Sequence, residues 1–391
     1  MRPGVRSVMQ EFVLSSYPEW QIGPFEKCHA VNPIMGPEPS TRFYCPVREE
    51  LVDWEAKDVF NPCAVTRHGR VYLLYRAEDH VGRYKGTSRI GLAVSEDGIT
   101  FERHSCPVLY PDNDSFLCFE REGGVEDPRI VEDEDRTYYM TYNAYNGVIS
   151  GKQCLATSRD LLHWTKHGLM AGLDGERQGG VGFKAGKIVS RLVDDRLVAT
   201  RINGKYWMYW GVEQLRVAVS DNLIHWERVL DEDGRDLVVM GPRPEERYSA
   251  TDNLAVEGGA AAILTEHGIV VMYNGISNPL PEQERVPTPE GPPFGNVWAG
   301  VQALFDANDP TRMLDRADEP FIKPDQPYEL EGQIGKVTFI EGLVFHRGQW
   351  LIYYGTADSY IAVAAASPKP GERVDVSGLS APAGAGAAVT L

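Results

Sequence analysis

The sequence predicts an all-β chain, a single-domain five-bladed β-propeller with an N-terminal extension. Three observations lead to this fold class. Five short aromatic segments recur at near-regular spacing, a turn-rich pattern follows the first three of them, and no long stretch has the 3.6-residue period of a helix. A β-sandwich rarely repeats internally and solenoid repeats are usually much shorter, so radial closure of small antiparallel sheets is favoured.

Each aromatic segment is a short apolar strand that ends near a tyrosine. The aligned tyrosines are 67, 67, 64 and 81 residues apart, which leaves room in each repeat for several short strands. The segments lie at 71–77, 136–144, 204–211, 269–275 and 350–357, and their tyrosines are Tyr75, Tyr142, Tyr209, Tyr273 and Tyr354.

The second pattern predicts a hairpin after each of the first three aromatic strands. AVSEDGITFER at 93–103, ATSRDLLHWTK at 156–166 and AVSDNLIHWER at 218–228 are variants of one unit. A small-residue strand, a turn and an aromatic strand follow one another, and Asp-Gly in the first copy favours a tight turn. The segment at 303–316 is a degenerate fourth copy.

The repeats divide the chain into three parts. Residues 1–55 are expected to wrap the propeller or to make oligomer contacts, residues 56–367 to form the catalytic propeller, and the Gly/Ala-rich residues 368–391 to be a tail. The sequence therefore leaves open whether the chain forms a homo-oligomer.

Composition excludes several classes of partner. A formal net charge of −17 predicts a surface that repels nucleic acid and anionic membranes. Six cysteines without CxxC or metal-ligand spacing are expected to be reduced, with no metal bound. Because no long apolar stretch or signal-peptide pattern occurs, we expect a cytoplasmic protein. An anionic substrate would need a local basic cluster.

The segment GGVEDPRI at 123–130 is the strongest chemical motif. Two glycines allow close backbone approach, and Pro128 restrains the chain after two adjacent carboxylates. Because neighbouring side chains of a strand point to opposite faces, only one of Glu126 and Asp127 should face the axis unless a bulge intervenes. A turn with solvated acids is the simpler interpretation.

Other polar residues lie at strand ends. Alternation places Arg76 and Glu78 on one face, where a surface ion pair is the simpler explanation. Arg89 follows in the next strand, and Asn61 and Asp358 occupy similar strand-end positions in the first and fifth repeats. None of them is informative alone.

Taken in order, these segments resemble glycoside hydrolase family 130, nearest to its 4-O-β-D-mannosyl-D-glucose phosphorylases. The resemblance rests on FNPCAV, YLLYRAED, TSRIGLAVSEDG, GGVEDPRI, MTYNAYN, ATSRDLLHW, INGKYWMYWG, GIVVMYNG, VQALFDANDPTRML and YYGTADSYIAVA, which span about residues 55–366. It implies a five-bladed propeller and action on β-mannosides, with inorganic phosphate as a co-substrate and no cofactor.

The resemblance also implies roles for individual residues. Asp127 matches the family's catalytic acid. Substrate-binding positions are expected at Asn61, Arg76, Arg89, Glu126 and Asp358, and phosphate-binding positions at Lys152, Lys184, Arg201, Tyr273 and Asn274. Two residues depart from the relatives, since Lys152 replaces an arginine and Gln214 replaces a histidine. Lysine keeps the charge but loses the two-bond grip of a guanidinium on phosphate.

The implied reaction is inverting phosphorolysis to α-D-mannose 1-phosphate and a released sugar. Phosphate is already anionic, so one acid and a few cations suffice. An inverting β-mannosidase would need a second carboxylate to deprotonate water, and Glu213 or Glu257 are the candidates. A non-catalytic sugar-binding propeller is a third alternative, which an intact Asp127 disfavours.

Overall fold

The computed structural model describes residues 17–81, 86–147, 152–170, 183–280, 284 and 295–367. Nearly all regular structure in these ranges is β-strand, which confirms the all-β class. The helices α2 (Leu117–Glu120) and α3 (Pro327–Leu330) are four residues each, and none in the described part could cross a membrane. The expected tail at 368–391 lies outside the described residues.

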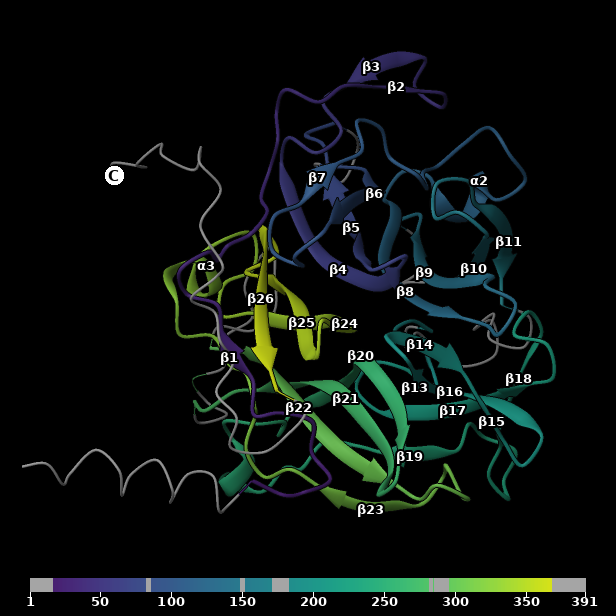
Figure 1. Cartoon of the computed structure of the whole chain (residues 1–391), viewed down its shortest axis with the longest axis vertical. Helices are drawn as coiled ribbons and strands as arrows, with labels where there is room; N and C mark the ends of the chain where they lie inside the picture. The colour runs from purple at the N-terminus through teal and green to yellow at the C-terminus, as the bar shows by residue number, and fades with distance from the viewer. Residues whose placement is uncertain are drawn as a thin grey trace, which may run out of the picture.

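The strands form five antiparallel units that follow one another along the chain. Each unit pairs neighbouring strands in sequence order, as Figure 1 shows. Unit 1 contains β4 (Asp58–Arg67), β5 (Arg70–Glu78), β6 (Ser88–Ser95) and β7 (Glu102–Arg103). Unit 2 contains β8 (Gly124–Glu132), β9 (Tyr138–Tyr145), β10 (Lys152–Ser158) and β11 (Thr165–Leu169).

Units 4 and 5 have the same order of pairing, whereas two of the six strands of unit 3 pair off its main order. Unit 3 contains β12 (Lys187–Ile188), β15 (Arg201–Ile202), β16 (Lys205–Trp210), β17 (Leu215–Ser220), β18 (Trp226–Arg228) and β19 (Val238–Met240). Unit 4 contains β20 (Ala255–Thr265), β21 (Gly268–Ser277), β22 (Val297–Phe305) and β23 (Met313–Arg316). Unit 5 contains β24 (Thr338–His346), β25 (Gln349–Thr356) and β26 (Tyr360–Ala366).

Three shorter pieces connect or extend the units. The strand β1 (Glu26–Lys27) pairs with β26 and gives unit 5 its fourth strand. The hairpin of β13 (Ser190–Val193) and β14 (Arg196–Ala199) pairs with both β8 and β20. A separate hairpin of β2 (Phe43–Cys45) and β3 (Glu50–Val52) projects beside unit 1 (Figure 1).

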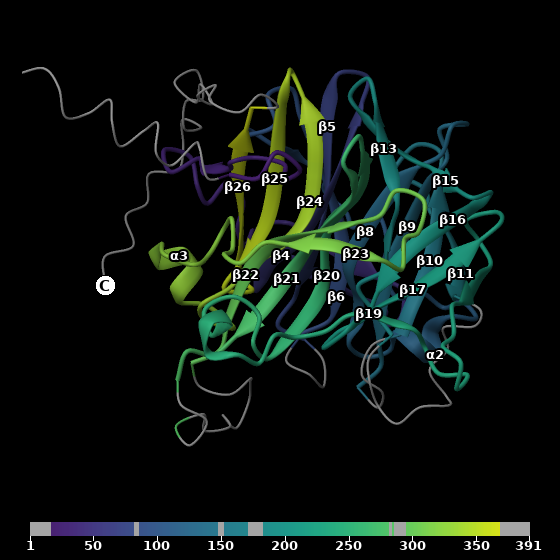
Figure 2. The same cartoon turned by 90° about the horizontal axis from the view of Figure 1, so that it is seen from below.

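The first strands of the units face a common centre. Contacts join β4 to β8, β8 to β12, β12 to β20, β20 to β24, and β24 back to β4. Figure 2 shows the same units from the side, with the strands of unit 5 standing next to one another. Side chains that leave the inner strands toward the centre therefore meet there, although they come from distant parts of the sequence.

The five aligned tyrosines all lie in the middle of their units and are fully buried, which confirms the predicted aromatic strands. Their hydroxyls are satisfied in a repeated way, because a buried phenol requires a hydrogen-bond partner. Four of them donate to carboxylates, as Tyr75 to Glu55, Tyr142 to Glu120, Tyr273 to Asp252 and Tyr354 to Glu329. Tyr209 instead donates to the carbonyl oxygen of Pro310.

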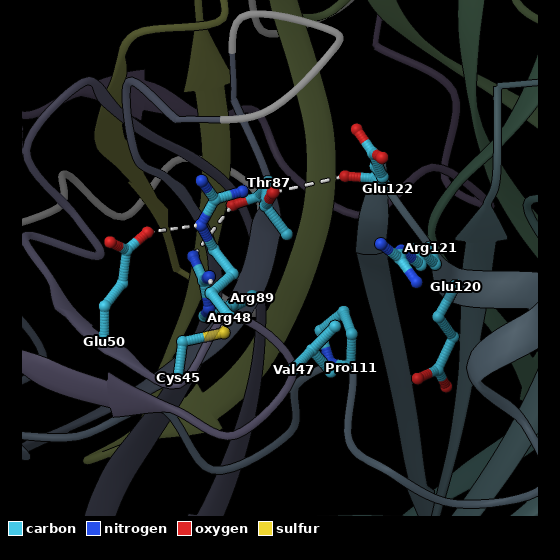
Figure 3. A pocket seen from close by; sticks show the side chains of 10 residues that line it. All are labelled: Cys45, Val47, Arg48, Glu50, Thr87, Arg89, Pro111, Glu120, Arg121 and Glu122. Atoms are coloured by element: carbon cyan, nitrogen blue, oxygen red, sulfur yellow. Dashed lines mark hydrogen bonds and ion pairs between the residues drawn. The ribbon is translucent and has the colours of Figure 1, made fainter.

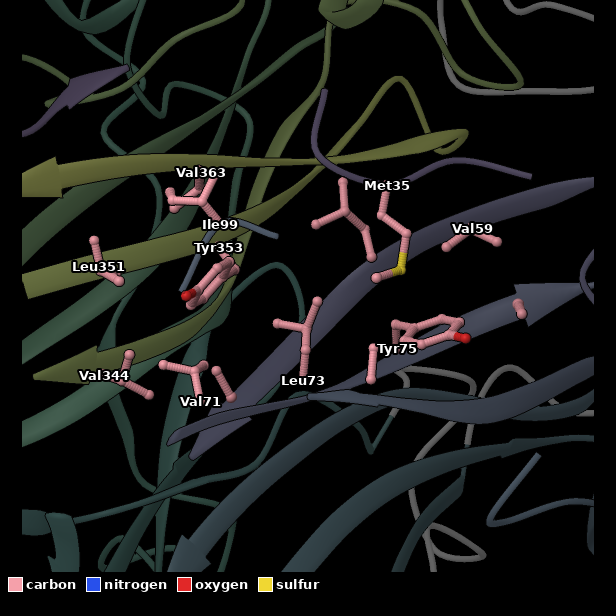
Figure 4. Packing of buried hydrophobic residues seen from close by; sticks show 14 of the residues in the cluster. Met35, Val59, Val71, Leu73, Tyr75, Ile99, Val344, Leu351, Tyr353 and Val363 are labelled. Atoms are coloured by element: carbon pink, nitrogen blue, oxygen red, sulfur yellow. The ribbon is translucent and has the colours of Figure 1, made fainter. Parts of the chain in front are cut away.

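Those carboxylates are neutralised by cations from other segments. Arg103 pairs with Glu55, Lys166 with Glu120, Arg316 with Asp252, and Lys27 with Glu329. Apolar side chains fill the space between units. Figure 4 shows one such layer, where Val59 and Leu73 of unit 1 pack in a cluster with Tyr353 and Val363 of unit 5. This rigid packing supports the centre.

Candidate active site

Bulges on the inner strands aim polar side chains at the centre. Pairing shifts between Phe60 and Pro62 on β4, so Asn61 has no partner and adopts φ +45°. On β8 the shift lies between Glu126 and Arg129, and Asp127 adopts φ +48°. A bulge interrupts strand alternation and re-aims a side chain. Proline follows Asn61 and Asp127 and supplies no N–H to the ladder.

The bulge on β8 brings both acidic residues of GGVEDPRI to one side. Arg76 Nη2 lies 3.0 Å from Glu126 Oε1, and Arg76 Nη1 lies 3.1 Å from Asp127 Oδ1. Asn61 Nδ2 donates to the same Asp127 oxygen at 3.0 Å. The exception allowed for a bulge therefore applies, and Arg76 contacts both Glu126 and Asp127 while Asn61 contacts Asp127. Together with Lys184, these four residues are called the axial cluster below.

Arg76 is held from several directions. Its Nη2 also lies 2.7 Å from Glu78 Oε1, which confirms that alternation puts the two residues on one face. Its Nε donates to Ser88 Oγ at 3.0 Å, and its guanidinium lies 4.6 Å from the Phe60 ring centre. One cation thus orients three carboxylates, two of which belong to the axial cluster.

Lys184 completes the axial cluster between two carboxylates. Its Nζ lies 3.8 Å from Asp127 Oδ2 and 3.1 Å from Glu257 Oε1, which comes from β20. Burial lowers the pKa of Lys184, but the charges of Glu257, Asp127 and Glu126 outweigh burial and raise it overall. Lys184 is therefore a firm cation beside Asp127, with Glu257 already bound to it.

Asp358 has a carboxylate with no hydrogen bond to any residue that the structure describes. Gln333 Nε2 lies 3.4 Å from Glu78 Oε2 and 3.5 Å from the Asp358 carbonyl oxygen, so Gln333 links Asp358 to the carboxylate that pairs with Arg76. Burial raises its pKa to about 7, with Arg76 opposing the rise and Asp127 adding to it. A half-buried carboxyl without a described partner is well suited to accept hydrogen bonds from the hydroxyl groups of a sugar.

The adjacent acids Glu126 and Asp127 differ in protonation. Burial raises the pKa of Glu126 to about 7, against the charge of Arg76. Burial would raise the pKa of Asp127 too, but Arg76, Lys184, Arg129 and the Asn61 amide outweigh it and hold that pKa below its usual range. A proton in this pair is thus held by Glu126 in preference to Asp127.

Arg129 and Glu341 are functional candidates that the sequence interpretation missed. Arg129 Nη1 lies 2.8 Å from Glu341 Oε1 and donates to the Asp127 carbonyl oxygen at 3.2 Å. Glu341 sits at a third bulge, on β24. Its only sequence signal is a single carboxylate within an otherwise apolar strand, in TFIEGLVF.

Arg201 is not brought to the axial cluster, and its phosphate role stays a prediction. It is exposed on β15 and donates to the carbonyl oxygens of Gly204 and Asp221. Arg201 pairs with Tyr206 near the start of β16, whereas Gly211, just beyond the other end of that strand, bonds to Lys184. The strand separates Arg201 from the centre.

Tyr273 and Asn274 have no polar group open to phosphate in this structure. The Tyr273 hydroxyl donates to Asp252 at 2.6 Å and accepts from Arg316 at 2.9 Å. The Asn274 amide is used in both directions by the backbone of Ile340, at 3.2 and 2.8 Å. Both residues stabilise the fold where phosphate binding was expected.

The other predicted positions lie near the cluster without joining it. Lys152 Nζ lies 5.4 Å from the Phe119 ring centre, and its backbone is bridged to Phe183, next to Lys184. Gln214 accepts from Arg216 at 3.2 Å. Arg89 is fully buried in an ion pair of 2.7 Å with Asp79, on the face of β6 opposite Ser88.

Comparisons with known proteins point to one family. A family model described as β-1,4-mannooligosaccharide phosphorylase matches residues 27–369. A 1,2-β-oligomannan phosphorylase of Thermoanaerobacter sp. (strain X514) is 31% identical over 80% of this chain and 90% of its own length. A solved glycosyl hydrolase from Bacteroides ovatus is 42% identical, covers 91% of this chain and 97% of its own, and has a TM-score of 0.82.

Another solved structure is 40% identical over 92% of this chain and 98% of its own, with a TM-score of 0.82. It comes from work reporting that the GH130 family of mannoside phosphorylases contains glycoside hydrolases that target β-1,2 mannosidic linkages in Candida mannan. The match to the family model covers most of the chain. The chain therefore belongs to glycoside hydrolase family 130 and is an enzyme.

Proposed function

We propose that this enzyme cleaves β-mannosidic linkages with inversion, using Asp127 as the proton donor and inorganic phosphate as the nucleophile. One observation carries the proposal. Asp127 is aimed at the common centre by a bulge and is held there by Asn61 and Arg76, and its charge contributes to the raised pKa of the Asp358 carboxyl. Family membership and the names of its phosphorylase members support the reaction class.

We also infer that the five units are the blades of a β-propeller. Two observations support this: the first strands contact one another in a closed order, and β1 completes the sheet of the last unit. In this arrangement residues 56–367 form the catalytic body, and part of the N-terminal segment closes it. The mannosyl unit would bind at the centre, where Asn61, Arg76 and Asp358 offer donors and acceptors to its hydroxyls.

The proton balance of the reaction follows from the site. The C1–oxygen bond of the mannoside breaks while a phosphate oxygen bonds to C1 from the opposite face. Asp127 delivers a proton to the leaving oxygen, directly or through the mannose 3-hydroxyl. Because the free site favours ionised Asp127, a proton must reach it when sugar binds, and Glu126 and Asp358, with pKa values raised to about 7, can supply one.

Phosphate would be held chiefly by Lys184. Lysine binds phosphate as a point charge, without the planar fork of arginine. Its ammonium is already paired with Glu257, and the negative charge of this carboxylate repels the phosphate dianion. We therefore expect a high KM for phosphate.

Water is the second candidate nucleophile, and the Lys184–Glu257 contact favours it. Glu257 is 4% exposed and lies close to Lys184, as Asp127 does, so the site holds a second carboxylate to serve as base. Glu213 is exposed, and its carbonyl oxygen accepts from Val256, the neighbour of Glu257. The solved relative from the work on β-1,2 mannosidases supports this alternative.

The test is the initial rate of cleavage as phosphate is titrated from zero. The substrates are β-1,2-mannobiose, β-1,4-mannobiose and β-1,4-mannosyl-glucose, because the named relatives and the family description differ in linkage. If the reaction is phosphorolysis, the initial rate should rise in proportion to the phosphate concentration when that concentration is low. The product should then be α-mannose 1-phosphate. Release of free mannose at the full rate without phosphate would show that the enzyme is a hydrolase. A failure to cleave any of these β-mannosides would overturn both the phosphorolysis and the hydrolysis proposals.

A further inference from the structure

Glu78, the last residue of β5, joins the axial cluster to a second cation that the proposed reaction does not use. Its Oε1 lies 2.7 Å from Arg76 Nη2, and its Oε2 lies 2.6 Å from Lys57 Nζ. Ser88 Oγ also donates to Oε1, at 3.2 Å. The side chain of Glu78 is 7% exposed. Glu78 is therefore a buried carboxylate with a cation on each oxygen, and one of these cations contacts Asp127.

The geometry makes Arg76 a counterion that several acids share. Its guanidinium contacts the carboxylates of Glu78, Glu126 and Asp127, and the contact with Glu78 is the shortest of the three. Because the energy between two charges falls with their distance, Glu78 neutralises much of the positive charge that Arg76 would otherwise exert on the other two acids. Without the charge of Glu78, Arg76 would favour the ionised forms of Glu126 and Asp127 more strongly.

The protonation of the neighbouring acids agrees with this role. Burial raises the pKa of Glu126 and of Asp358 to about 7, and the charge of Glu78 adds to both rises. Burial acts on Glu78 in the same direction, but Arg76 and Lys57 outweigh it and hold the pKa of Glu78 below its usual range. Glu78 is thus a lasting negative charge beside acids that retain protons.

Lys57 and Gln333 hold the outer side of Glu78. Lys57 Nζ donates to Gln333 Oε1 at 2.7 Å and lies 3.5 Å from Asp58 Oδ2. Gln333 Nε2 in turn donates to Glu78 Oε2 at 3.4 Å. These contacts fix one oxygen of the carboxylate, so that the other oxygen stays on Arg76.

Arg89, on the neighbouring strand, does not neutralise Glu78. It lies on the face of β6 opposite Ser88 and pairs with Asp79 at 2.7 Å. Figure 3 shows Arg89 in the wall of a separate cavity. In the described part of the chain, the ion pairs of Glu78 are thus the two with Arg76 and Lys57.

We propose that Glu78 is a positioning residue of the reaction, which neutralises Arg76 so that the axial acids keep a proton for the leaving oxygen. The inference rests on the proposed function, because it concerns the supply of a proton to Asp127. Without the charge of Glu78, Arg76 draws Glu126, Asp127 and Asp358 toward their ionised forms, and the proton leaves the site at a lower pH. Glu78 acts through Arg76 and takes no part in making or breaking bonds.

The experiment compares the pH profiles of wild type, Glu78→Gln and the control Glu132→Gln. The control also takes a buried glutamate from an arginine, because Glu132, the last residue of β8, is 2% exposed and pairs with Arg196 at 2.6 Å. The measured quantity is kcat/KM for the cleaved mannoside at one fixed phosphate concentration. Its alkaline limb reports the ionisation of the essential acid in the free enzyme. This limb should lie about one pH unit lower in Glu78→Gln than in wild type, and the control should leave it in place.

Thermal stability gives a second readout that needs no activity. Because burial raises the pKa of Glu126 and of Asp358, the folded state keeps their protons longer than the unfolded state, and this stabilisation is lost as pH rises from about 4 to about 7. Glu78→Gln should lower both folded-state pKa values. Its Tm should therefore fall less than that of wild type between about pH 5 and about pH 8. Glu132→Gln should follow wild type.

The outcomes separate this inference from the proposed function. If Glu78→Gln lowers turnover at every pH without moving the alkaline limb, its role is only structural and the inference is overturned. The same holds if Glu132→Gln moves the limb equally. If Glu78→Gln is inactive, a Tm that falls with pH as in wild type overturns the inference. If wild type cleaves no β-mannoside, the proposed function fails, and the Tm comparison still decides whether Glu78 sets the protonation of the site.

Discussion

Arg129 and Glu341 form a buried ion pair that joins two inner strands directly beside Asp127. The side chains are 2% and 0% exposed, and their charged atoms lie 2.8 Å apart. Arg129 also donates to the carbonyl oxygens of Asp127 and Gly258, at 3.2 and 2.9 Å. One guanidinium therefore fixes the backbone that presents Asp127 and the backbone that follows Glu257.

Removing this guanidinium should be far more costly than removing an exposed one. Arg129→Met leaves Glu341 buried without its partner, which typically lowers the free energy of unfolding by about 3–5 kcal/mol. Arg42→Met, at an exposed pair with Asp53, should cost no more than about 1 kcal/mol. Chemical denaturation of both variants measures the difference. Equal losses in the free energy of unfolding would mean that the buried Arg129–Glu341 pair contributes no more to stability than the exposed Arg42–Asp53 pair.

Asp127→Asn should abolish most turnover and leave the fold intact. A positioned general acid contributes at least about a hundredfold, and Asn cannot donate the proton. Asn tolerates the φ of +48° at this bulge, as Asp does. Asp127→Ala removes the same acid but places an ill-suited side chain at that φ, so it should melt lower than Asp127→Asn. Near-normal kcat in Asp127→Asn would exclude its role as the acid.

Lys184→Ala should raise the phosphate requirement much more than the mannoside requirement. The lysine is the cation that we assign to phosphate, and losing one charged hydrogen bond typically costs about ten- to a hundredfold in affinity. The check is the apparent KM for each substrate at saturation of the other. Equal rises in both values would place Lys184 on the sugar rather than on phosphate.

Glu257→Gln distinguishes the two nucleophiles by the sign of its effect. With phosphate, the substitution releases Lys184 from its 3.1 Å partner, so the phosphate KM should fall. With water, the same change removes the base, and cleavage should drop by at least about a hundredfold. Initial rates with and without phosphate give the answer, and a variant identical to wild type would remove Glu257 from both mechanisms.

Asp358→Asn should stabilise the protein at alkaline pH and have no such effect in acid. Burial raises the Asp358 pKa from 3.8 to about 7. The folded state therefore keeps the proton longer than the unfolded state, and this contribution to stability is lost as pH rises from about 4 to about 7. Melting temperatures of wild type and variant should coincide near pH 4 and diverge above pH 7. A constant gap at all pH values would contradict the shift.

Local repeats made most of the fold readable from sequence. The five tyrosines recur because each unit buries the same side chain in its middle strand, so their spacing reports the units directly. The interiors of the inner strands were harder to interpret. Asp127 was found because it lies in GGVEDPRI, and Asn61 because it lies at a strand end within FNPCAV, whereas Glu341 has no such signal.

The expected site positions that lie away from the axial cluster share a physical cause. A residue's place in the chain does not show which end of a strand faces the centre, so the sequence could not show that Arg201, on β15, lies away from Lys184. Nor does it show whether a polar group is already used, as Tyr273 is by Asp252 and Arg316. Pairings such as Lys184 with Glu257 join segments that only the closed arrangement brings together.

The pairing of β1 with β26 has a consequence for biosynthesis. Lys27 is made 302 positions before Glu329, and β26 is made later still. The last unit can therefore acquire its fourth strand, and the buried Glu329 its cation, only after all five units have left the ribosome. A nascent chain that stops before β26 therefore cannot pair β1 with unit 5.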